Sequence, residues 1–288
     1  MTRRYTLTTL ATATLLACAS SHAEPPPAYS PPDYPGAGLV RKMFGENKLY
    51  FRIGALYAIP YIKTHSIVLK NLSELASVAV EPGPQEGEAY SDPQLQPAAI
   101  IGYRLPWGDG GWSVETVVGA PPTLKIKARG KIADQPLVKE ANGIPTGVPA
   151  LGHNVAETKA IPPVVTLVKR FRLNQRLRPY AGLGLTYLYT YDTHVTNPIL
   201  TEFGEPKLTI DNKFGWVAQA GLDAHVKGPW WATLDIKYIS VPNVTATMEK
   251  TYIRAPGLPQ YQYAEVGDAQ FKADLNNLAI TLGAGFTF

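Results

Sequence analysis

The amino-acid sequence predicts an all-β fold: an eight-stranded antiparallel transmembrane β-barrel with long outer loops and short periplasmic turns. Residues 271–288 alternate between apolar side chains on one face and small or polar side chains on the other, as a strand between lipid and a lumen requires. Long and short connections alternate between the predicted strands. The aromatic residues fall into two bands near the strand ends, as they do at membrane interfaces.

The last strand carries the clearest of these patterns. Its outward face consists of Leu278, Ile280, Leu282, Ala284, Phe286 and Phe288. A soluble edge strand this apolar would invite aggregation, whereas lipid favours such a face. A chain that ends on Phe after this alternation resembles the terminal signal of outer-membrane barrels, so Phe286 and Phe288 are the predicted membrane-insertion signal.

The first residues predict a signal peptide and an extended tail. Arg3 and Arg4 precede an uncharged run and a small-residue cleavage site, which indicates a secretory signal at residues 1–23. Two alternatives remain: Cys18 lies in a lipobox-like sequence and would then be lipidated, and the arginine pair weakly resembles a twin-arginine signal. Residues 24–46 are rich in proline and predict a periplasmic tail, which leaves residues 47–288 for the barrel.

Composition narrows the class of protein further. The chain is 45% hydrophobic and 17% charged, but after the signal no apolar run approaches the roughly 18 residues of a spanning helix. The net charge is +4, including the two signal arginines, which is too small to predict a nucleic-acid partner. The only cysteine is Cys18, so a chain that loses the signal has no disulfide or thiolate site.

The strands and their connections follow from alternation and turn signals. The predicted strands are residues 49–59, 95–105, 112–126, 164–172, 180–195, 213–226, 230–248 and 271–288. The long links are residues 63–94, 127–161, 196–211 and 249–270. The aromatic band near the periplasmic ends comprises Phe51, Tyr103, Trp107, Trp112, Phe171, Tyr180, Trp230, Trp231, Phe286 and Phe288. An even number of strands places both chain termini on the periplasmic side.

Alternation also predicts which side chains line the lumen. These are Arg52, Leu56, Arg104, Glu115, Leu188, Gln219, Asp223, His225, Asp235 and Lys237. Lone charges in a narrow space of low dielectric are costly. We therefore expect the six charged residues other than His225 to pair into a network that plugs the lower lumen.

Two proline pairs interrupt neighbouring strands. Pro121 and Pro122 lie within the third predicted strand, and Pro162 and Pro163 open the fourth. Because proline has no N–H to donate, pairing between these strands should weaken and leave a lateral gap for an apolar molecule. The alternative is that the prolines merely end strand pairing above the membrane.

Neither catalysis nor a cofactor is predicted. His225 with Asp223 and Asp235 can be drawn as an acid/base cluster, but pairing with the lumen cations accounts for the same residues. No metal-ligand spacing occurs among the scattered histidines. The basic run of Lys169, Arg170, Arg172, Arg176 and Arg178 predicts a solvated collar at a periplasmic turn.

Several motifs in the second half of the chain resemble the OmpW family of outer-membrane barrels. They are Pro162-Pro163, residues 179–187 (PYAGLGLTY), residues 216–223 (WVAQAGLD), Trp230 with residues 235–238 (DIKY), and the aromatic C-terminus. The resemblance implies a narrow lumen in the Gram-negative outer membrane that passes small, often hydrophobic molecules. It implies as partners outer-membrane lipid, such solutes and the barrel-assembly machinery. Residues 63–94 and 127–161 are longer than usual for the family, so substrate preference transfers poorly.

Three functions remain open on the sequence. The first is a passive channel for small, hydrophobic molecules, with a possible lateral exit into the bilayer. The second is a plugged structural or interaction barrel, whose long outer loops bind a surface partner or phage; an eight-stranded lumen is narrow enough for side chains to fill. The third is a secreted, lipocalin-type barrel.

Overall fold

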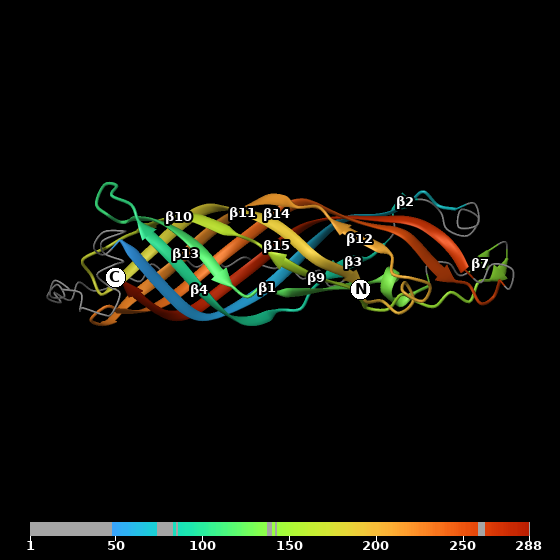
Figure 1. Ribbon diagram of the computed structural model, residues 1–288, viewed down its shortest axis with the longest axis horizontal. Coiled ribbons are helices and arrows are strands. Elements are labelled where there is room, and N and C mark those ends of the chain that lie inside the picture. The colour runs from blue at the N-terminus through green and yellow to red at the C-terminus, as the bar shows by residue number, and fades with distance from the viewer. Residues whose placement is uncertain are drawn as a thin grey trace, which may run out of the picture.

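The computed structural model describes residues 48–73, 83–84, 86–136, 140–141, 143–258 and 263–287. The predicted signal peptide, the proline-rich tail and Phe288 lie outside the described residues. The predicted barrel is confirmed: eight strands form a closed antiparallel ring, in the order β1, β4, β5, β10, β11, β13, β14, β15 and back to β1 (Figure 1). Their bounds are β1 Leu49–Lys70, β4 Gln94–Arg104, β5 Trp112–Gly119, β10 Val164–Arg170, β11 Leu177–Val195, β13 Lys213–Lys227, β14 Trp230–Arg254 and β15 Tyr263–Thr287.

The two ends of the barrel differ in their connections. Short links at residues 105–111, 171–176 and 228–229 lie at one end, which we call the turn end (left in Figure 1). Longer links and short extra strands lie at the other, which we call the loop end. The first and last ring strands both reach the turn end, where Tyr50 pairs with Thr287. Within the described residues, no helix is long and apolar enough to cross a membrane.

The outer wall is apolar, as the alternation predicts. Ile53, Leu183 and Phe214 are 70%, 70% and 72% exposed, and they project from three different strands. The side chains that alternate with them face the lumen and include many buried polar and charged groups. A water-soluble protein has the reverse distribution, so this wall is built for an apolar surrounding.

Several strands are longer than predicted. β1 continues to Lys70 and β14 to Arg254, although loops were predicted from residues 63 and 249. Pairing between β1 and β15 also continues as far as Lys70 and Asp268. Polar residues such as Lys63 and Asp274 interrupt the apolar alternation in this region. The backbone hydrogen-bond ladder continues there without an apolar outer face. The alternation that predicts a strand therefore ends before the strand itself ends.

The prediction that residues 112–126 form one continuous strand was wrong. β5 ends at Gly119, and after Pro121 and Pro122 a separate strand β6 (Thr123–Arg129) leaves the ring. β6 pairs with β9 (Asn154–Ile161) and β3 (Glu88–Tyr90), not with β4 and β10. The remaining elements of the loop end are β2 (Gly83–Pro84), α3 (Lys131–Asp134), β7 (Glu140–Ala141), β8 (Ile144–Pro145) and β12 (Lys207–Ile210).

Two glycines let tyrosine rings lie across the inner wall. A Cβ at Gly102 would come within 1.9 Å of Tyr50 Cζ, and one at Gly221 within 2.2 Å of Tyr180 Cζ. Any other residue would therefore push the ring away from the backbone. Glycine at these positions lets both phenol hydroxyls reach the centre of the lumen.

We predict that Gly221→Ala destabilises the barrel by about 1–3 kcal/mol, because the new methyl group must displace the Tyr180 ring from a packed position. Urea unfolding of the protein refolded in detergent micelles measures the loss. Gly119→Ala is the matched control, since a Cβ there meets its nearest atom at an ordinary 3.5 Å. Equal unfolding midpoints for the two variants would contradict the packing argument.

Candidate functional site

Six charged side chains fill the part of the lumen nearer the turn end. They come from five strands, none is more than 7% exposed, and together we call them the polar plug: Arg52, Glu115, Arg170, Asp223, Asp235 and Lys237. Inward alternation on β1, β5, β10, β13 and β14 brings them to similar heights in the ring. Buried charges are tolerated only when they are paired, so their contacts determine whether this layer is stable.

The plug is paired throughout. The Arg52 guanidinium lies 3.1 Å from Glu115 Oε1 and 3.2 Å from Asp223 Oδ2. Arg170 contacts the same two carboxylates, at 2.6 Å and 3.1 Å. Lys237 pairs with Asp235, two residues away on β14. Three cations thus meet three carboxylates, and the plug carries no net charge.

Neutral side chains link the ion pairs into one network. Tyr50 donates to Glu115 at 2.5 Å, and Tyr180 donates to Asp235 at 2.8 Å. The Gln219 amide donates to both carboxylates, at 2.8 Å to Glu115 and 2.6 Å to Asp235. The Thr166 hydroxyl donates to the Gln219 carbonyl oxygen at 2.7 Å. A cross-linked layer of this kind closes the lumen with side chains.

Other predicted lumen residues lie at the borders of the plug. Leu56 and Leu188 are buried on its loop-end side. Arg104 has no carboxylate partner in the described part of the chain and lies 5.8 Å from the Tyr50 ring centroid. His225 Nε2 lies 2.9 Å from the Gly228 carbonyl oxygen, so its ring contacts the β13–β14 turn. The acid/base cluster drawn from His225 gains no support, because the two aspartates bond to plug cations.

The structure corrects the reading of two residues near the turn end. Arg170 was predicted to be part of a solvated collar, but it is 4% exposed and holds two carboxylates. Tyr180 was assigned to the aromatic band near the periplasmic ends, as part of a girdle at the membrane interface, but it is 3% exposed and lies opposite Arg170 in the β10–β11 ladder. Arg170 continues the alternating set of buried residues Val164, Thr166 and Val168, which indicates an inward-facing side chain. Arg170 was instead grouped with the basic residues around it in the sequence, and so was predicted to be solvated.

An apolar cavity of about 290 Å³ lies between the plug and the loop end. Its wall is mainly aliphatic and includes Pro122, Leu124, Pro162, Leu188, Val241 and Leu275. Ile239, two residues beyond Lys237 on β14, places the cavity floor directly against the plug. An apolar molecule fits this chamber, whose lining includes only two charged residues, Glu88 and Lys127, on β3 and β6.

The barrel wall changes partners beside the cavity floor. The β5–β10 ladder ends at Thr116 and Val165, and the β6–β9 ladder begins at Thr123 and Lys159. Among the described residues between these ladders, one backbone bond crosses, from Ala160 N–H to the Pro122 carbonyl oxygen at 3.2 Å. Thr116 directly follows Glu115, so the interruption begins at the level of the plug. We call it the β5–β10 gap.

The described residues contain no group of three or more His, Cys, Asp or Glu side chains that could hold a metal ion. The polar plug has acidic members, but arginine and lysine groups occupy their lone pairs. The site is therefore a closed polar layer beside an apolar chamber.

Three comparisons relate this architecture to known proteins. A family model described as the OmpW family matches residues 109–288. Outer membrane protein W of Vibrio cholerae serotype O1 (strain ATCC 39315 / El Tor Inaba N16961) is 30% identical over 95 residues, which span 33% of this chain and 43% of that protein. The crystal structure of the outer membrane protein OprG from Pseudomonas aeruginosa is similar with a TM-score of 0.62 and 17% identity, covering 84% of this chain and 96% of that one. At this identity, the likeness to OprG shows the shared barrel fold.

We predict that Asp235→Ala destabilises the barrel by about 3–5 kcal/mol, because Lys237 would remain buried without its carboxylate. Urea unfolding in micelles measures this loss. Glu249→Ala is the control: it breaks an exposed pair between β14 and Lys207 and should cost less than about 1 kcal/mol. If both variants unfold at the parent midpoint, the plug contributes no stability.

Proposed function

Because this chain belongs to the OmpW family, and is thus an outer-membrane barrel, we propose that it is a passive channel for small hydrophobic molecules. In this proposal the solute enters the apolar cavity from the loop end and leaves sideways through the β5–β10 gap. No catalytic step is needed, since an apolar solute moves down its own concentration gradient into the bilayer.

The polar plug supports a sideways route over a straight one. A solute that continued toward the turn end would have to separate Arg52 and Arg170 from Glu115 and Asp223. An apolar molecule offers those charges no replacement partner, so the desolvation cost would oppose passage. The same molecule loses nothing by remaining against aliphatic side chains.

The β5–β10 gap is the observation that carries the proposal. Pro122 and Pro162 line the cavity on one side and border the interrupted ladder on the other. Proline cannot donate a backbone hydrogen bond, so the sequence itself prevents the wall from closing fully here. The gap begins at the height where the plug stops a solute, and the outward neighbours Val118, Ile161 and Val165 are exposed and apolar.

We also propose that the turn end faces the periplasm, with both chain termini on that side. Outer-membrane barrels generally have short periplasmic turns and longer extracellular loops. Both Leu49 and Thr287 lie at the turn end. The long loops and the entrance to the cavity then face the medium.

For the route itself, we predict that replacing Pro121, Pro122, Pro162 and Pro163 together with Val or Thr slows uptake of a hydrophobic solute about tenfold or more. The new N–H groups should extend the ladders and narrow the exit. Liposomes containing the purified protein, loaded with a binding protein for the solute, report the rate of uptake.

Two controls separate the exit from general damage. Replacing Pro256, which lies in the loop-end connection, with Val should leave uptake unchanged. A small polar solute should permeate equally slowly with all variants, because the plug stays closed. Unchanged hydrophobic uptake by the four-proline variant would exclude an exit here, and no uptake by the parent protein would favour the plugged interaction barrel.

For the orientation, we predict that a membrane-impermeant maleimide labels Glu205→Cys but not Asn174→Cys on intact cells. Glu205 is exposed in a loop-end connection, and Asn174 is exposed at the turn end. Both should label in permeabilised cells, and the unsubstituted chain provides the background from Cys18. Labelling of Asn174→Cys on intact cells would reverse the proposed orientation.

A further inference from the structure

The turn end of the lumen has two cations more than the plug requires. The plug is balanced, but Arg104 at the end of β4 and Arg178 near the start of β11 add positive charge beside it. Arg178 lies over the Trp231 ring at 4.0 Å and donates to the Gln175 carbonyl oxygen at 3.3 Å. In the described part of the chain, neither guanidinium has a carboxylate within ion-pair distance.

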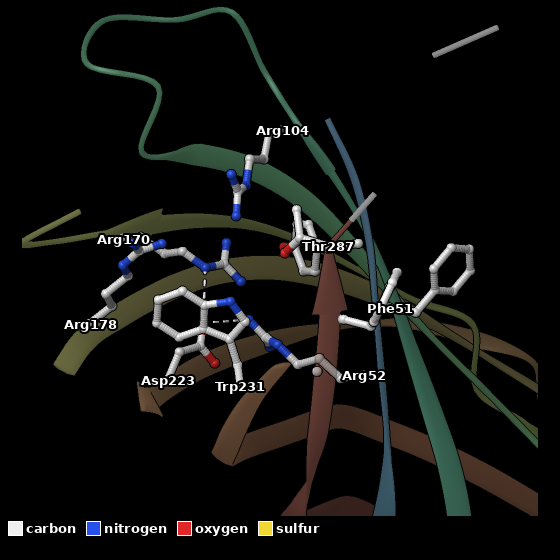
Figure 2. Close-up of a pocket in the computed structure, with 11 residues that line it drawn as sticks. Phe51, Arg52, Arg104, Arg170, Arg178, Asp223, Trp231 and Thr287 are labelled. Carbon is white, nitrogen blue, oxygen red and sulfur yellow. Dashed lines mark hydrogen bonds and ion pairs between the residues drawn. The ribbon is translucent and has the colours of Figure 1, made fainter. Parts of the chain in front are cut away.

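These two side chains border a small pocket of about 20 Å³ at the turn end. Arg52, Arg170 and Asp223 of the plug form its inner side, and Trp231 is part of its wall. Figure 2 shows Arg104 reaching into this space from its own strand, toward Arg170, with Trp231 and Asp223 beyond. Four guanidinium groups therefore surround one site, and the Asp223 carboxylate is already held by Arg52, Arg170 and the Thr233 hydroxyl.

We propose that this pocket binds a single phosphate group, which is either free phosphate or the headgroup of a phospholipid in the adjoining leaflet. The planar donor fork of arginine matches the oxygens of an oxyanion, and the low dielectric of the plug strengthens the attraction.

Charge and position favour phosphate over a carboxylate. Free phosphate carries up to two negative charges and so matches the two spare guanidinium charges, whereas a carboxylate would leave one cation unpaired. The phosphodiester of a phospholipid carries one negative charge, so for a headgroup the argument rests on position. Phe51 and Phe286 also border the pocket, and Phe286 packs edge-on against Trp230 at 5.2 Å between centroids. Aromatic side chains of this kind mark the membrane interface, which is the depth of phospholipid phosphates.

The test uses the full chain in a nonionic, phosphate-free detergent. Inorganic phosphate, added at constant ionic strength against chloride, should raise the thermal unfolding midpoint to a plateau, because a ligand that binds only the folded state stabilises it. The double variant Arg104→Gln/Arg178→Gln should lose this rise. Arg178→Gln alone, at a half-buried position that is less critical for folding, should weaken the apparent affinity about tenfold.

The control variant is Arg176→Gln, which removes the same charge from an exposed position in the neighbouring turn and should keep the full phosphate effect. A second arm replaces free phosphate with phosphatidylglycerol and compares it with a phosphate-free glycolipid. A rise with free phosphate alone identifies a soluble ligand, and a rise with the phospholipid alone identifies a headgroup. The proposal is overturned if neither free phosphate nor phosphatidylglycerol raises the midpoint above its chloride or glycolipid reference, or if the double variant responds as the parent does.

Discussion

The structure depends on the pairing of charges in a lumen too narrow to hydrate them. Arg52 and Arg170 each contact both Glu115 and Asp223, so four strands that are distant in sequence are joined through four side chains. Removing one member leaves its partners charged and buried, which is the most expensive state for such groups. The arrangement fixes the height and orientation of Tyr50 and Tyr180, and through them the requirement for glycine at residues 102 and 221.

The same constraint divides the interior into regions with different solvent properties. Near the plug, the buried charged side chains are all paired, with apolar side chains such as Val168 and Val217 between them. Beyond Lys237 the inward positions of β14 become Ile239 and Val241, and the interior becomes apolar within one step of the strand. This sharp boundary lies beside the β5–β10 gap. The floor of the apolar cavity and the β5–β10 gap therefore lie at the same height in the barrel.

The sequence was sufficient to predict the barrel, because side chains on a strand alternate strictly and an apolar side chain is favoured at each of the many positions that face lipid. Ile53 and Leu282, for example, indicate the outer face from their spacing alone. Alternation also assigns Arg52 and Asp235 to the inner face, where the structure places them, but it carries no information about partners. Which residues meet depends on the ring order and the stagger of the strands. Arg104, expected in the network, lies beside it with no carboxylate partner among the described residues, and Arg170, expected in solvent, lies within it.

The ends of strands could not be predicted where their residues are polar. The loop-end parts of β1, β14 and β15 lack a continuous apolar face, so they were predicted as loops. The proline pairs could be recognised in the sequence. The departure of β6 from the ring could not be predicted, because no local pattern shows that β9 becomes its neighbour.

The length of the strands determines how far the barrel extends beyond a membrane. β14 has 25 residues, which is about 80 Å of extended chain, or about 60 Å in height at the usual barrel tilt of about 40°. The apolar belt of an outer-membrane barrel is only about 25 Å tall. More than half of the length of β14 therefore extends beyond such a belt, as do long parts of its neighbour β15 and of β1. In the proposed function, a hydrophobic solute would therefore enter the barrel at a distance from the membrane and pass the hydrated headgroup region inside the apolar cavity.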